Sequence, residues 1–346
     1  MITNLLRENI KNLKAYSSAR DEFEGEASIW LDANESPTSL PNLPNGINRY
    51  PAAQLKDLKK QIALVKGVDA SQVFIGNGSD EAVDILFRCF CNPGKDKALV
   101  FPPTYGMYNV CAAVNDVEVI ESQMDESFFI NLNSFEKRNE EAPKLTFICN
   151  PNNPTGNTQS AETIRRIIEL SKGIVVVDEA YIDFCPDKSV IKWINDYPNL
   201  VVLQTLSKAW GLAGARVGLA FASPEIIGVM NKVKFPYNVG KPSIDIALDA
   251  LKMNGLMEQR VVENSLNKQL LINGLKQFQI VEKIFPSDSN FVLIKFTDHK
   301  SVYSTLAKNG IVVRDRNSQP GCERCLRITV GTREEVEKLI YCLNQM

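Results

Sequence analysis

Apolar runs and helical patterns alternate along the first two thirds of the chain. Runs rich in Val, Ile, Leu and Phe predict strands at 73–75, 97–101, 117–121, 144–149, 173–178, 200–205 and 217–222. Helical patterns fall between most of them, for example at 80–90 and 160–171. Strands that are apolar on both faces and alternate with helices are typical of a largely parallel sheet covered on both sides. The pattern therefore predicts an α/β domain built on a mostly parallel, seven-stranded sheet.

A second, smaller unit follows a stretch rich in Pro and Gly at 234–243. Beyond it lie a long helical pattern, three strand-like runs and a final helix, which together predict a smaller α+β domain. The strand-like runs are 290–296, 311–315 and 325–330, and the final helix starts from Thr332. We therefore expect an N-terminal arm, a large domain and a small C-terminal domain, over residues 1–27, 28–238 and 239–346.

The composition excludes several classes of protein. A net charge of −2 provides no basic surface for nucleic acid or for an anionic membrane. No apolar run reaches the roughly 18 residues of a membrane span, and the N-terminus mixes charges with apolar positions, unlike a signal peptide. The eight cysteines are scattered, mostly in apolar stretches, and predict reduced core residues of a cytoplasmic protein.

Histidine and cysteine usage bears on the possible chemistry. The single histidine, His299, lies at what looks like the start of an exposed helix. One histidine excludes catalytic triads and zinc sites that need several. The pair Cys322 and Cys325 has CxxC spacing, but one pair cannot complete a tetrahedral zinc site. We expect no metal, and we expect proton transfer to depend on lysine, carboxylate or tyrosine.

Polar residues follow the predicted strands, where ligands bind in open α/β sheets. The stretch GNGSDE at 76–81 opens a helix. Its glycines permit close approach of the backbone, and a helix N-terminus offers amide donors to an anion. A capped helix start explains the same residues without a ligand. The stretch is neither GxGxxG nor GxxxxGK[ST], so dinucleotide and NTP sites lose their main support.

Three further strands end in residues that suit a planar ligand. Tyr105 lies at a strand-to-helix turn, where its ring either stacks on a ligand or joins the core. Asn153 lies in NPNNPTG, which either forms a rigid turn or holds a ligand oxygen. Asp178 ends an apolar strand, where an unpaired carboxylate is costly, so it needs a cationic or hydrogen-bonding partner. Tyr181 follows three residues later.

The stretch TLSKAWGLAGARVG places Lys208 and Arg216 in a segment otherwise suited to burial. Lys208 either reaches solvent from the edge of a core element or is a reactive amine with a lowered pKa. Arg216 offers a guanidinium fork to phosphate. A phosphate site, a stacking ring, a buried carboxylate and a lysine together fit pyridoxal 5′-phosphate, whose aldehyde bonds to lysine and whose ring nitrogen pairs with Asp178.

With these residues in place, the chain resembles the fold-type-I PLP-dependent aminotransferases, and within them the histidinol-phosphate aminotransferase subgroup. The resemblance runs almost end to end through LDANESP (31–37), RYP (49–51), GNGSDE, PTYGMY (103–108), NPNNPTG, VVDEAYIDF (176–184), TLSKAWGLAGARVG and CLRITVGT (325–332). It implies a fold-type-I transferase fold, pyridoxal 5′-phosphate as cofactor and a homodimer with shared active sites.

The resemblance also implies residue roles. The catalytic residues would be Lys208, which binds the cofactor and moves protons, Asp178 and Tyr181. The cofactor would contact Gly78, Ser79, Asp80, Tyr105, Asn153, Asp178, Tyr181, Ser207, Lys208 and Arg216, and also Tyr50 donated across the dimer interface. The substrate would contact Tyr16, Asn34, Arg314 and Arg327.

For the subgroup, the implied reaction is reversible amino transfer between L-histidinol phosphate and 2-oxoglutarate, which gives imidazole acetol phosphate and L-glutamate in histidine biosynthesis. An aromatic or broad-specificity aminotransferase would share all but the substrate contacts. A threonine-phosphate decarboxylase would share the phosphate site but release carbon dioxide. A ligand-sensing regulator would carry a basic DNA-binding module, for which this chain has no spare length. Fold similarity alone does not separate these alternatives.

Overall fold

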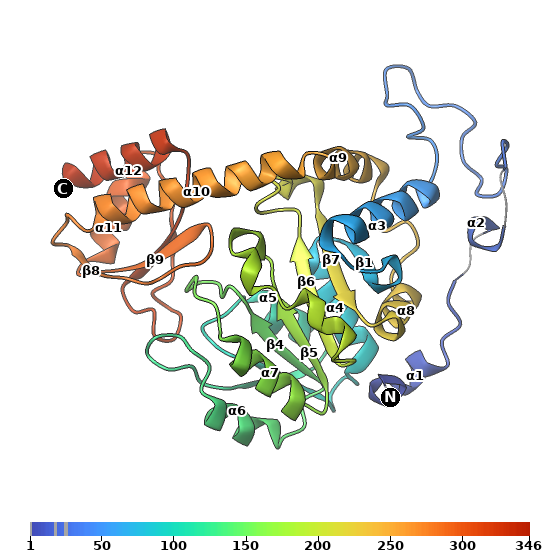
Figure 1. Ribbon diagram of the computed structural model, residues 1–346, viewed down its shortest axis with the longest axis horizontal. Coiled ribbons are helices and arrows are strands. Elements are labelled where there is room, and N and C mark those ends of the chain that lie inside the picture. The colour runs from blue at the N-terminus through green and yellow to red at the C-terminus, as the bar shows by residue number, and fades with distance from the viewer. Residues whose placement is uncertain (1, 17–18, 24–26) are drawn as a thin grey trace.

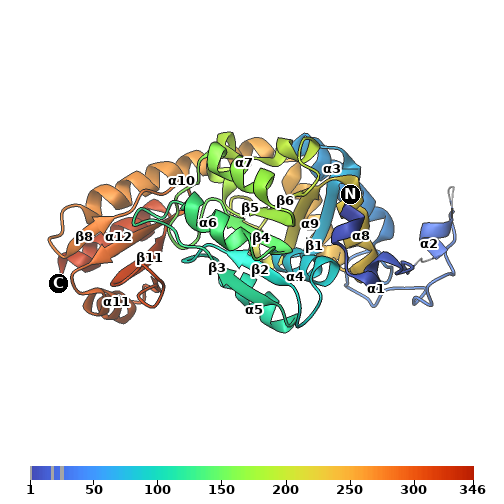
Figure 2. The same ribbon diagram turned by 90° about the horizontal axis from the view of Figure 1, so that it is seen from below.

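The computed structural model describes residues 2–16, 19–23 and 27–346. Its two units lie side by side, and the long helix α10 (Asn254–Leu275) extends from the larger unit across the smaller one (Figures 1 and 2). Between α1 (Glu8–Lys11) and α3 (Ala52–Lys66), the chain passes outside the body of the molecule (Figure 1). We call the described residues between these two helices the outer segment.

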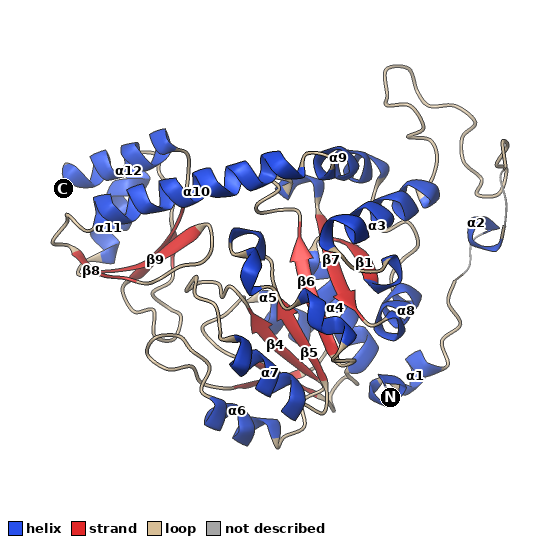
Figure 3. Ribbon diagram, viewed as in Figure 1, coloured by secondary structure: helices blue, strands red, loops and turns tan. Residues whose placement is uncertain are grey.

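The larger unit contains a seven-stranded sheet (Figure 3) with the order β1-β7-β6-β5-β4-β2-β3. Only β7 runs against its neighbours, and all other pairs are parallel. Each of the seven predicted runs forms a strand: β1 (Val73–Asn77), β2 (Lys97–Val100), β3 (Glu118–Glu121), β4 (Leu145–Cys149), β5 (Ile174–Asp178), β6 (Leu200–Thr205) and β7 (Val217–Ala222). The predicted mostly parallel, seven-stranded α/β fold is confirmed.

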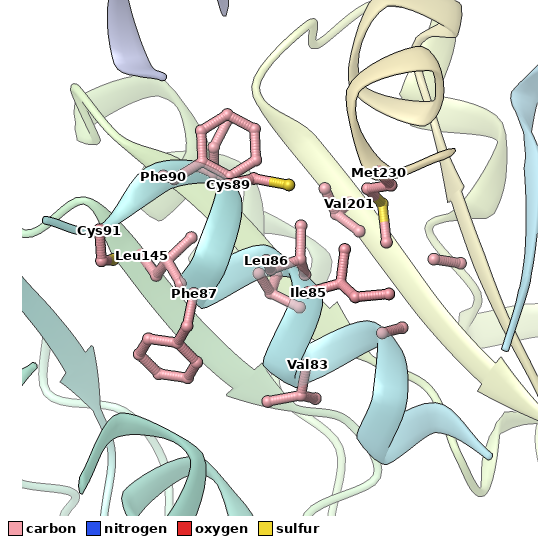
Figure 4. Packing of buried hydrophobic residues seen from close by; sticks show 14 of the residues in the cluster. Val83, Ile85, Leu86, Phe87, Cys89, Phe90, Cys91, Leu145, Val201 and Met230 are labelled. Carbon is pink, nitrogen blue, oxygen red and sulfur yellow. The ribbon is translucent and has the colours of Figure 1, made fainter. Parts of the chain in front are cut away.

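Helices cover both faces of this sheet, because its central strands are apolar on both sides. Alternate residues of one strand join different clusters: Val176 packs on one face and Val175 on the other. Figure 4 shows part of the first cluster, in which Phe87 of α4 lies on the side of Leu145, and Ile85 of α4 lies on the side of Val201 and of Met230 from α8. That face is covered by α4 (Ser79–Phe90), α5 (Met107–Val114) and α8 (Pro224–Val233), and the other by α3, α7 (Ala161–Leu170) and α9 (Lys241–Leu251).

Short elements fill the remaining connections of the larger unit. The α-helical one is α6 (Leu132–Asn139), whereas α2 (Ala19–Glu22) lies on the outer segment. The 3-10 turns are η1 (Ile2–Leu5), η2 (Ala70–Gln72), η3 (Ile182–Phe184), η4 (Pro186–Lys188), η5 (Ile191–Asn195) and η6 (Ala213–Ala215). The apolar residues of the first turns, Ile2, Leu6 and Ile10, are buried in the same cluster as α4. The amphipathic N-terminus therefore packs on the larger unit.

The smaller unit contains a four-stranded antiparallel sheet with the order β10-β11-β9-β8. Its strands are β8 (Val281–Ile284), β9 (Phe291–Phe296), β10 (Arg314–Asp315) and β11 (Cys325–Thr329). Leu326 and Ile328 of β11 pack in a core with α10, α11 (His299–Lys308) and α12 (Arg333–Asn344). The predicted α+β unit is confirmed, but β8, with two charged residues in a four-residue strand, was not predicted.

Three details of the smaller unit differ from or refine the expectations. Only 314–315 of the predicted strand 311–315 pairs with β11. The side chain of Thr332 caps α12 and forms a capping box with Glu335, which explains why the helix starts there. His299 does begin a helix, but the expectation of exposure is wrong. It is 6% exposed because it occupies the inner face of α11, while the Asp298 side chain caps the helix.

All eight cysteines are buried and free, as expected for core positions. Cys322 and Cys325 pack against Phe128, Phe285 and Leu293. Burial raises the pKa of the Cys322 thiol to about 12 and that of Cys325 to about 11. These two thiols are therefore apolar packing groups. Among the described residues, no helix combines the length and the apolar character that a membrane crossing requires.

The helices α9 and α10 connect the two units, and their apolar residues belong to different cores. Leu251 of α9 packs beneath the large sheet, whereas Leu271 and Leu275 of α10 pack in the core of the smaller unit. Core packing thus changes from one unit to the other along α10. The division into 1–27, 28–238 and 239–346 remains a prediction.

Candidate active site

The strands β1, β2, β4, β5 and β6 run in one direction, so their carboxyl ends meet at one edge of the large sheet (Figure 1). A pocket opens there. It is lined by Ser79, Asp80, Tyr105, Cys149, Asn153, Asp178, Ala180, Tyr181, Thr205, Ser207, Lys208 and Arg216. Only Cys149, Ala180 and Thr205 of these were not predicted from the sequence. Residues spread over 138 positions of sequence therefore share one cavity because the parallel strands end together.

Asp178 lies at the buried base of this pocket, at the end of β5, and is 3% exposed. Its carboxylate accepts hydrogen bonds from the Tyr108 hydroxyl at 2.6 Å and from the Ala180 backbone N–H at 3.1 Å. Burial nevertheless raises its pKa to about 6, since these two donors only partly replace water. A carboxylate of this kind is poised to pair with a cationic group of a ligand.

Lys208 follows β6 and lines the same pocket, from which its side chain remains accessible. The surrounding protein partly desolvates its ammonium, and this effect lowers the pKa of the lysine. The charge of Arg327 lowers it further, while the charge of Asp178 opposes the change. The Lys208 Nζ lies 5.3 Å from the centre of the Tyr181 ring. A lysine whose neutral form is favoured suits nucleophilic and proton-transfer chemistry.

An anion-binding turn lies at the other side of the pocket, at the N-terminus of α4. Gly78 has φ 82°, and a Cβ at this position would meet the Arg216 guanidinium at 2.7 Å. The left-handed backbone favours glycine here, and the missing side chain leaves room for the Arg216 guanidinium beside the turn. Ser79 and Asp80 of the first turn of α4 line the pocket with Arg216, and no side chain of the described residues caps this helix, so its first N–H groups are available to a ligand. Such an arrangement suits a phosphate group.

Hydrogen bonds and one ion pair connect the hydroxyl groups and the carboxylate beside this turn. The Tyr105 hydroxyl donates to Asp80 at 3.0 Å, and the Asp80 carboxylate lies 3.7 Å from Arg216. Thr205 donates its hydroxyl hydrogen to the Ser207 Oγ at 2.9 Å and accepts from the Ser207 backbone N–H at 3.1 Å. The Asp80 contact places Arg216 beside the first turn of α4, and the Thr205 contacts fix the turn that carries Ser207.

A third group connects the pocket to the smaller unit. The Asn153 Nδ2 donates to the Tyr181 hydroxyl at 3.4 Å, and the Asn153 Oδ1 accepts a hydrogen bond from Arg327 of β11. The Arg327 guanidinium also lies 5.1 Å from the Phe291 ring centre. Of the predicted substrate residues, Arg327 is thus the one that reaches a pocket residue.

The other predicted substrate and interface residues lie elsewhere in this chain. Arg314 is exposed on β10, directly across the ladder from Arg327. Tyr16 and Asn34 are exposed on the outer segment. Tyr50 is 50% exposed and stacks on Tyr237 at a centroid distance of 4.6 Å. Within the described residues, none of these four lines the pocket.

Glu35 explains why the motifs LDANESP and RYP occur together. Its nearly buried carboxylate pairs with Arg20 at 2.6 Å and with Arg49 at 2.8 Å, and it accepts from the Tyr50 backbone N–H at 2.6 Å. The side chain of Arg20 also bonds to Asp32 and to the Tyr50 carbonyl. These contacts fix the backbone at Tyr50. Within LDANESP, the residue predicted to contact substrate is Asn34, and Glu35 was not predicted to have a role.

Tyr108 and Thr205, which also contribute to the site, were not predicted from the sequence. Tyr108 is fully buried, and a buried tyrosine hydroxyl usually has a polar partner, which here is Asp178. Its position three residues after Tyr105 was a usable signal, because that spacing brings two side chains to one side of a helical turn. The rings contact edge to face at 5.6 Å. Thr205 gave no signal of its own, since it reads as the last residue of a strand.

Comparisons with known proteins agree with this geometry. The model of the family described as aminotransferase class I and II matches residues 28–343. The chain belongs to this family. The expectation of an aminotransferase is therefore confirmed, and the lysine and carboxylate described above lie within the matched region.

Individual relatives show which aminotransferases this chain resembles in sequence and in fold. A histidinol-phosphate aminotransferase of Parabacteroides distasonis is 46% identical over 345 residues, which cover 100% of this chain and 99% of the relative. One of Flavobacterium psychrophilum is 46% identical over 348 residues, with the same coverage. The structure of histidinol-phosphate aminotransferase from Sinorhizobium meliloti in complex with pyridoxal-5′-phosphate superposes with a TM-score of 0.79 at 23% identity, over 86% of this chain and 82% of the other. That likeness confirms the fold-type-I fold.

Proposed function

We propose that this aminotransferase transfers an amino group reversibly between L-histidinol phosphate and 2-oxoglutarate, giving imidazole acetol phosphate and L-glutamate in histidine biosynthesis. The observation that carries the proposal is the identity of 46% over the whole chain with histidinol-phosphate aminotransferases. The pocket is consistent with it, because Lys208 and the buried Asp178 lie together beside an arginine-bearing strand of the smaller unit.

The cofactor of the enzyme is pyridoxal 5′-phosphate, and the pocket fits this group. Among the described residues, the buried Asp178 forms no ion pair, so its carboxylate is available to the ring nitrogen, and the turn at Gly78 and Ser79 with Arg216 and Ser207 suits the phosphate. Tyr105 would lie along the ring, and Asn153 with Tyr181 would bond its hydroxyl. When bound, the cofactor withdraws electrons from the substrate carbon that loses its proton.

The residues of this chain then have separate tasks. Asp178 would keep the ring nitrogen protonated, and the Tyr108 hydroxyl would hold the carboxylate in place from behind. Lys208 would hold the cofactor and, when released, move a proton at the substrate carbon. Its lowered pKa favours the neutral amine that such a transfer needs. Asn153 and Tyr181 would set the orientation of the ring.

The substrate anions would bind beside the smaller unit. Arg327 lies closest, through its contact with Asn153, and Arg314 faces it across the ladder. Histidinol phosphate lacks an α-carboxylate, whereas glutamate carries two carboxylates, so the same arginines would accept differently placed anions. Guanidinium groups suit this task because they form paired hydrogen bonds with either anion. Tyr16 and Asn34 would join them from the outer segment.

The active enzyme would be a cytoplasmic homodimer with shared sites. Tyr16, Asn34 and Tyr50 lie on a segment that extends from the body of one chain, exposed but with a fixed backbone at Tyr50 (Figure 1). In a dimer, this segment would reach the pocket of the second copy, where Tyr50 would contact the cofactor phosphate. The division into an N-terminal arm, a large domain and a small domain fits this arrangement.

The test compares kcat/KM for the half-reactions of histidinol phosphate, phenylalanine and threonine phosphate. We expect histidinol phosphate to be the best of the three. A preference for phenylalanine would instead indicate an aromatic aminotransferase, and release of carbon dioxide from threonine phosphate would indicate a decarboxylase. Arg327→Lys serves as the site control. It should lower kcat/KM for histidinol phosphate and glutamate by about tenfold to a hundredfold and leave the cofactor absorbance intact.

A further inference from the structure

The ladder between β10 and β11 places three arginines on one face of the small sheet. Arg314 pairs with Arg327, and the Arg316 backbone N–H donates to the Cys325 carbonyl at 2.9 Å, which extends the same register by one pair. Side chains alternate between the faces of a strand, so residues 314 and 316 share the face of their partners 325 and 327. Arg314, Arg316 and Arg327 therefore project from one side of the sheet.

This face is directed towards the lysine pocket. The opposite face carries Leu326 and Ile328, which are buried in the core of the smaller unit. On the arginine face, Arg327 bonds to Asn153 of the pocket and lies over the Phe291 ring. Phe291 in turn contacts the Tyr181 ring edge to face at 5.1 Å. Arg316, on the same face, is half-buried rather than extended into solvent.

The three arginines have no acidic partner. Within the described residues, none of them forms an ion pair, and the Nε atoms of Arg316 and Arg327 are buried without a hydrogen-bond partner. Arg324, on the same hairpin, differs because it pairs with Glu282 at 2.8 Å. Burial lowers the pKa of Arg316 to about 10, and the positive charges of Arg327 and Arg314 add to this effect. Three neighbouring guanidinium groups without a carboxylate repel one another, and an anion bound among them would relieve this repulsion.

We propose that Arg316 determines specificity: together with Arg314 and Arg327 it binds the phosphate dianion of the amino substrate and favours it over the carboxylate donor. The inference rests on the proposed function. A phosphomonoester carries a charge of about −1.5 to −2 near neutral pH, whereas a carboxylate carries −1. A third cation at a similar distance therefore attracts the phosphate about twice as strongly as it attracts a carboxylate.

The decisive variant is Arg316→Gln, which keeps a polar side chain of moderate length and removes the charge. We expect kcat/KM for histidinol phosphate to fall about tenfold to a hundredfold. The value for glutamate should fall less, and that for histidinol, which has no phosphate, should stay unchanged. The affinity of the resting enzyme for inorganic phosphate, measured by competition with histidinol phosphate, should fall in parallel with kcat/KM for histidinol phosphate. Arg316→Lys should recover part of the loss, because it restores the charge without the planar fork.

Arg324→Gln is the matched control, since it removes an arginine from the same hairpin whose charge is already paired. Arg324→Gln should leave the ratio of kcat/KM for histidinol phosphate to kcat/KM for glutamate unchanged. If the wild-type enzyme does not interconvert histidinol phosphate and imidazole acetol phosphate, the proposed function is wrong, whatever the effect of Arg316. If it does, but Arg316→Gln lowers all three values equally or none of them, the role of Arg316 is wrong. Urea unfolding midpoints of the variants separate a binding effect from a loss of folded protein.

Discussion

The pocket around Lys208 and the outer segment differ in whether their side chains find partners within a single chain. In the pocket, Asp178 and Asn153 are buried, and their hydrogen-bond partners belong to the same chain. On the outer segment, Tyr16 is 74% exposed and Tyr50 is 50% exposed, although the backbone beside Tyr50 is fixed by Glu35. A fixed backbone that presents exposed side chains is expected of a surface that a second copy covers. This difference is the basis of our proposal that pocket residues act within their own chain and outer-segment residues act in the partner.

The largest effect should come from Lys208 itself. Lys208→Ala removes the group that we expect to hold the cofactor and move the proton, so kcat should fall about a hundredfold to ten-thousandfold. Borohydride reduction of the wild-type enzyme followed by peptide mapping should place the pyridoxyl group on this lysine. Lys192→Ala, which changes an exposed lysine on η5, should keep full activity. A pyridoxyl group on any other lysine would contradict the assignment.

Asp178→Asn should have the next largest effect. It removes a buried carboxylate from its expected cation, and kcat/KM should fall about a hundredfold to a thousandfold, as for a broken buried ion pair. Measurement of both half-reactions at saturating cofactor separates this loss from weaker cofactor binding. An Asn variant with wild-type kcat/KM would show that Asp178 does not pair with the ring nitrogen.

The same variant tests the electrostatics of the cofactor-free protein. Folding raises the Asp178 pKa from 3.8 to about 6, so the folded state binds this proton more tightly than the unfolded state does. The contribution to the free energy of unfolding is therefore complete below pH 3.8 and is lost as the pH rises through 6. Between pH 5 and 7, the wild-type protein should lose about 1 kcal/mol relative to Asp178→Asn. Urea unfolding at the two pH values measures this difference, and a constant difference would contradict it.

Tyr50→Ala sharpens the comparison between the two regions, because its effect should appear in the other subunit. The variant should lose about tenfold in kcat/KM, as expected for a lost hydrogen bond to phosphate. When it is mixed and refolded with Lys208→Ala, hybrid dimers should regain one intact site each, so about a quarter of all sites become active. Sedimentation of a fully active monomer, or no recovery on mixing, would show that Tyr50 acts within its own chain or not at all.

Tyr108→Phe should have an effect no larger than that of Tyr50→Ala. It leaves the buried ring in place and removes only the hydroxyl that donates to Asp178 at 2.6 Å. The pKa of Asp178 should rise further, and kcat/KM should fall about tenfold, the lower end expected for a hydrogen bond to a charged group. A shift in the pH dependence of the cofactor absorbance would identify an effect on the carboxylate. An unchanged profile would show that Tyr108 only fills space.

Much of the fold and most of the pocket could be predicted because the signals were local. The strands of the large sheet are apolar on both faces, and all seven runs form strands. Gly78, Asp178 and Lys208 each occur at or just beyond the end of a strand, where an ordinary core or surface residue would be expected. Parallel strands bring such residues to one edge of a sheet, so their meeting in one pocket also followed from the pattern.

The tertiary structure decided the contacts that depend on partners far away in the sequence. The sequence determined that Asp178 needed a partner, but only the packing of α5 on β5 shows that Tyr108 supplies a hydrogen bond. In the same way, β8 has too few apolar residues to be recognised alone and exists because β9 pairs with it. Arg316 reads as one more charge in a loop until the ladder places it beside Arg314 and Arg327. Propensity and hydrophobic pattern act between neighbours in the chain, whereas hydrogen bonds and charge repulsion act between neighbours in space, and only the fold determines which residues those are.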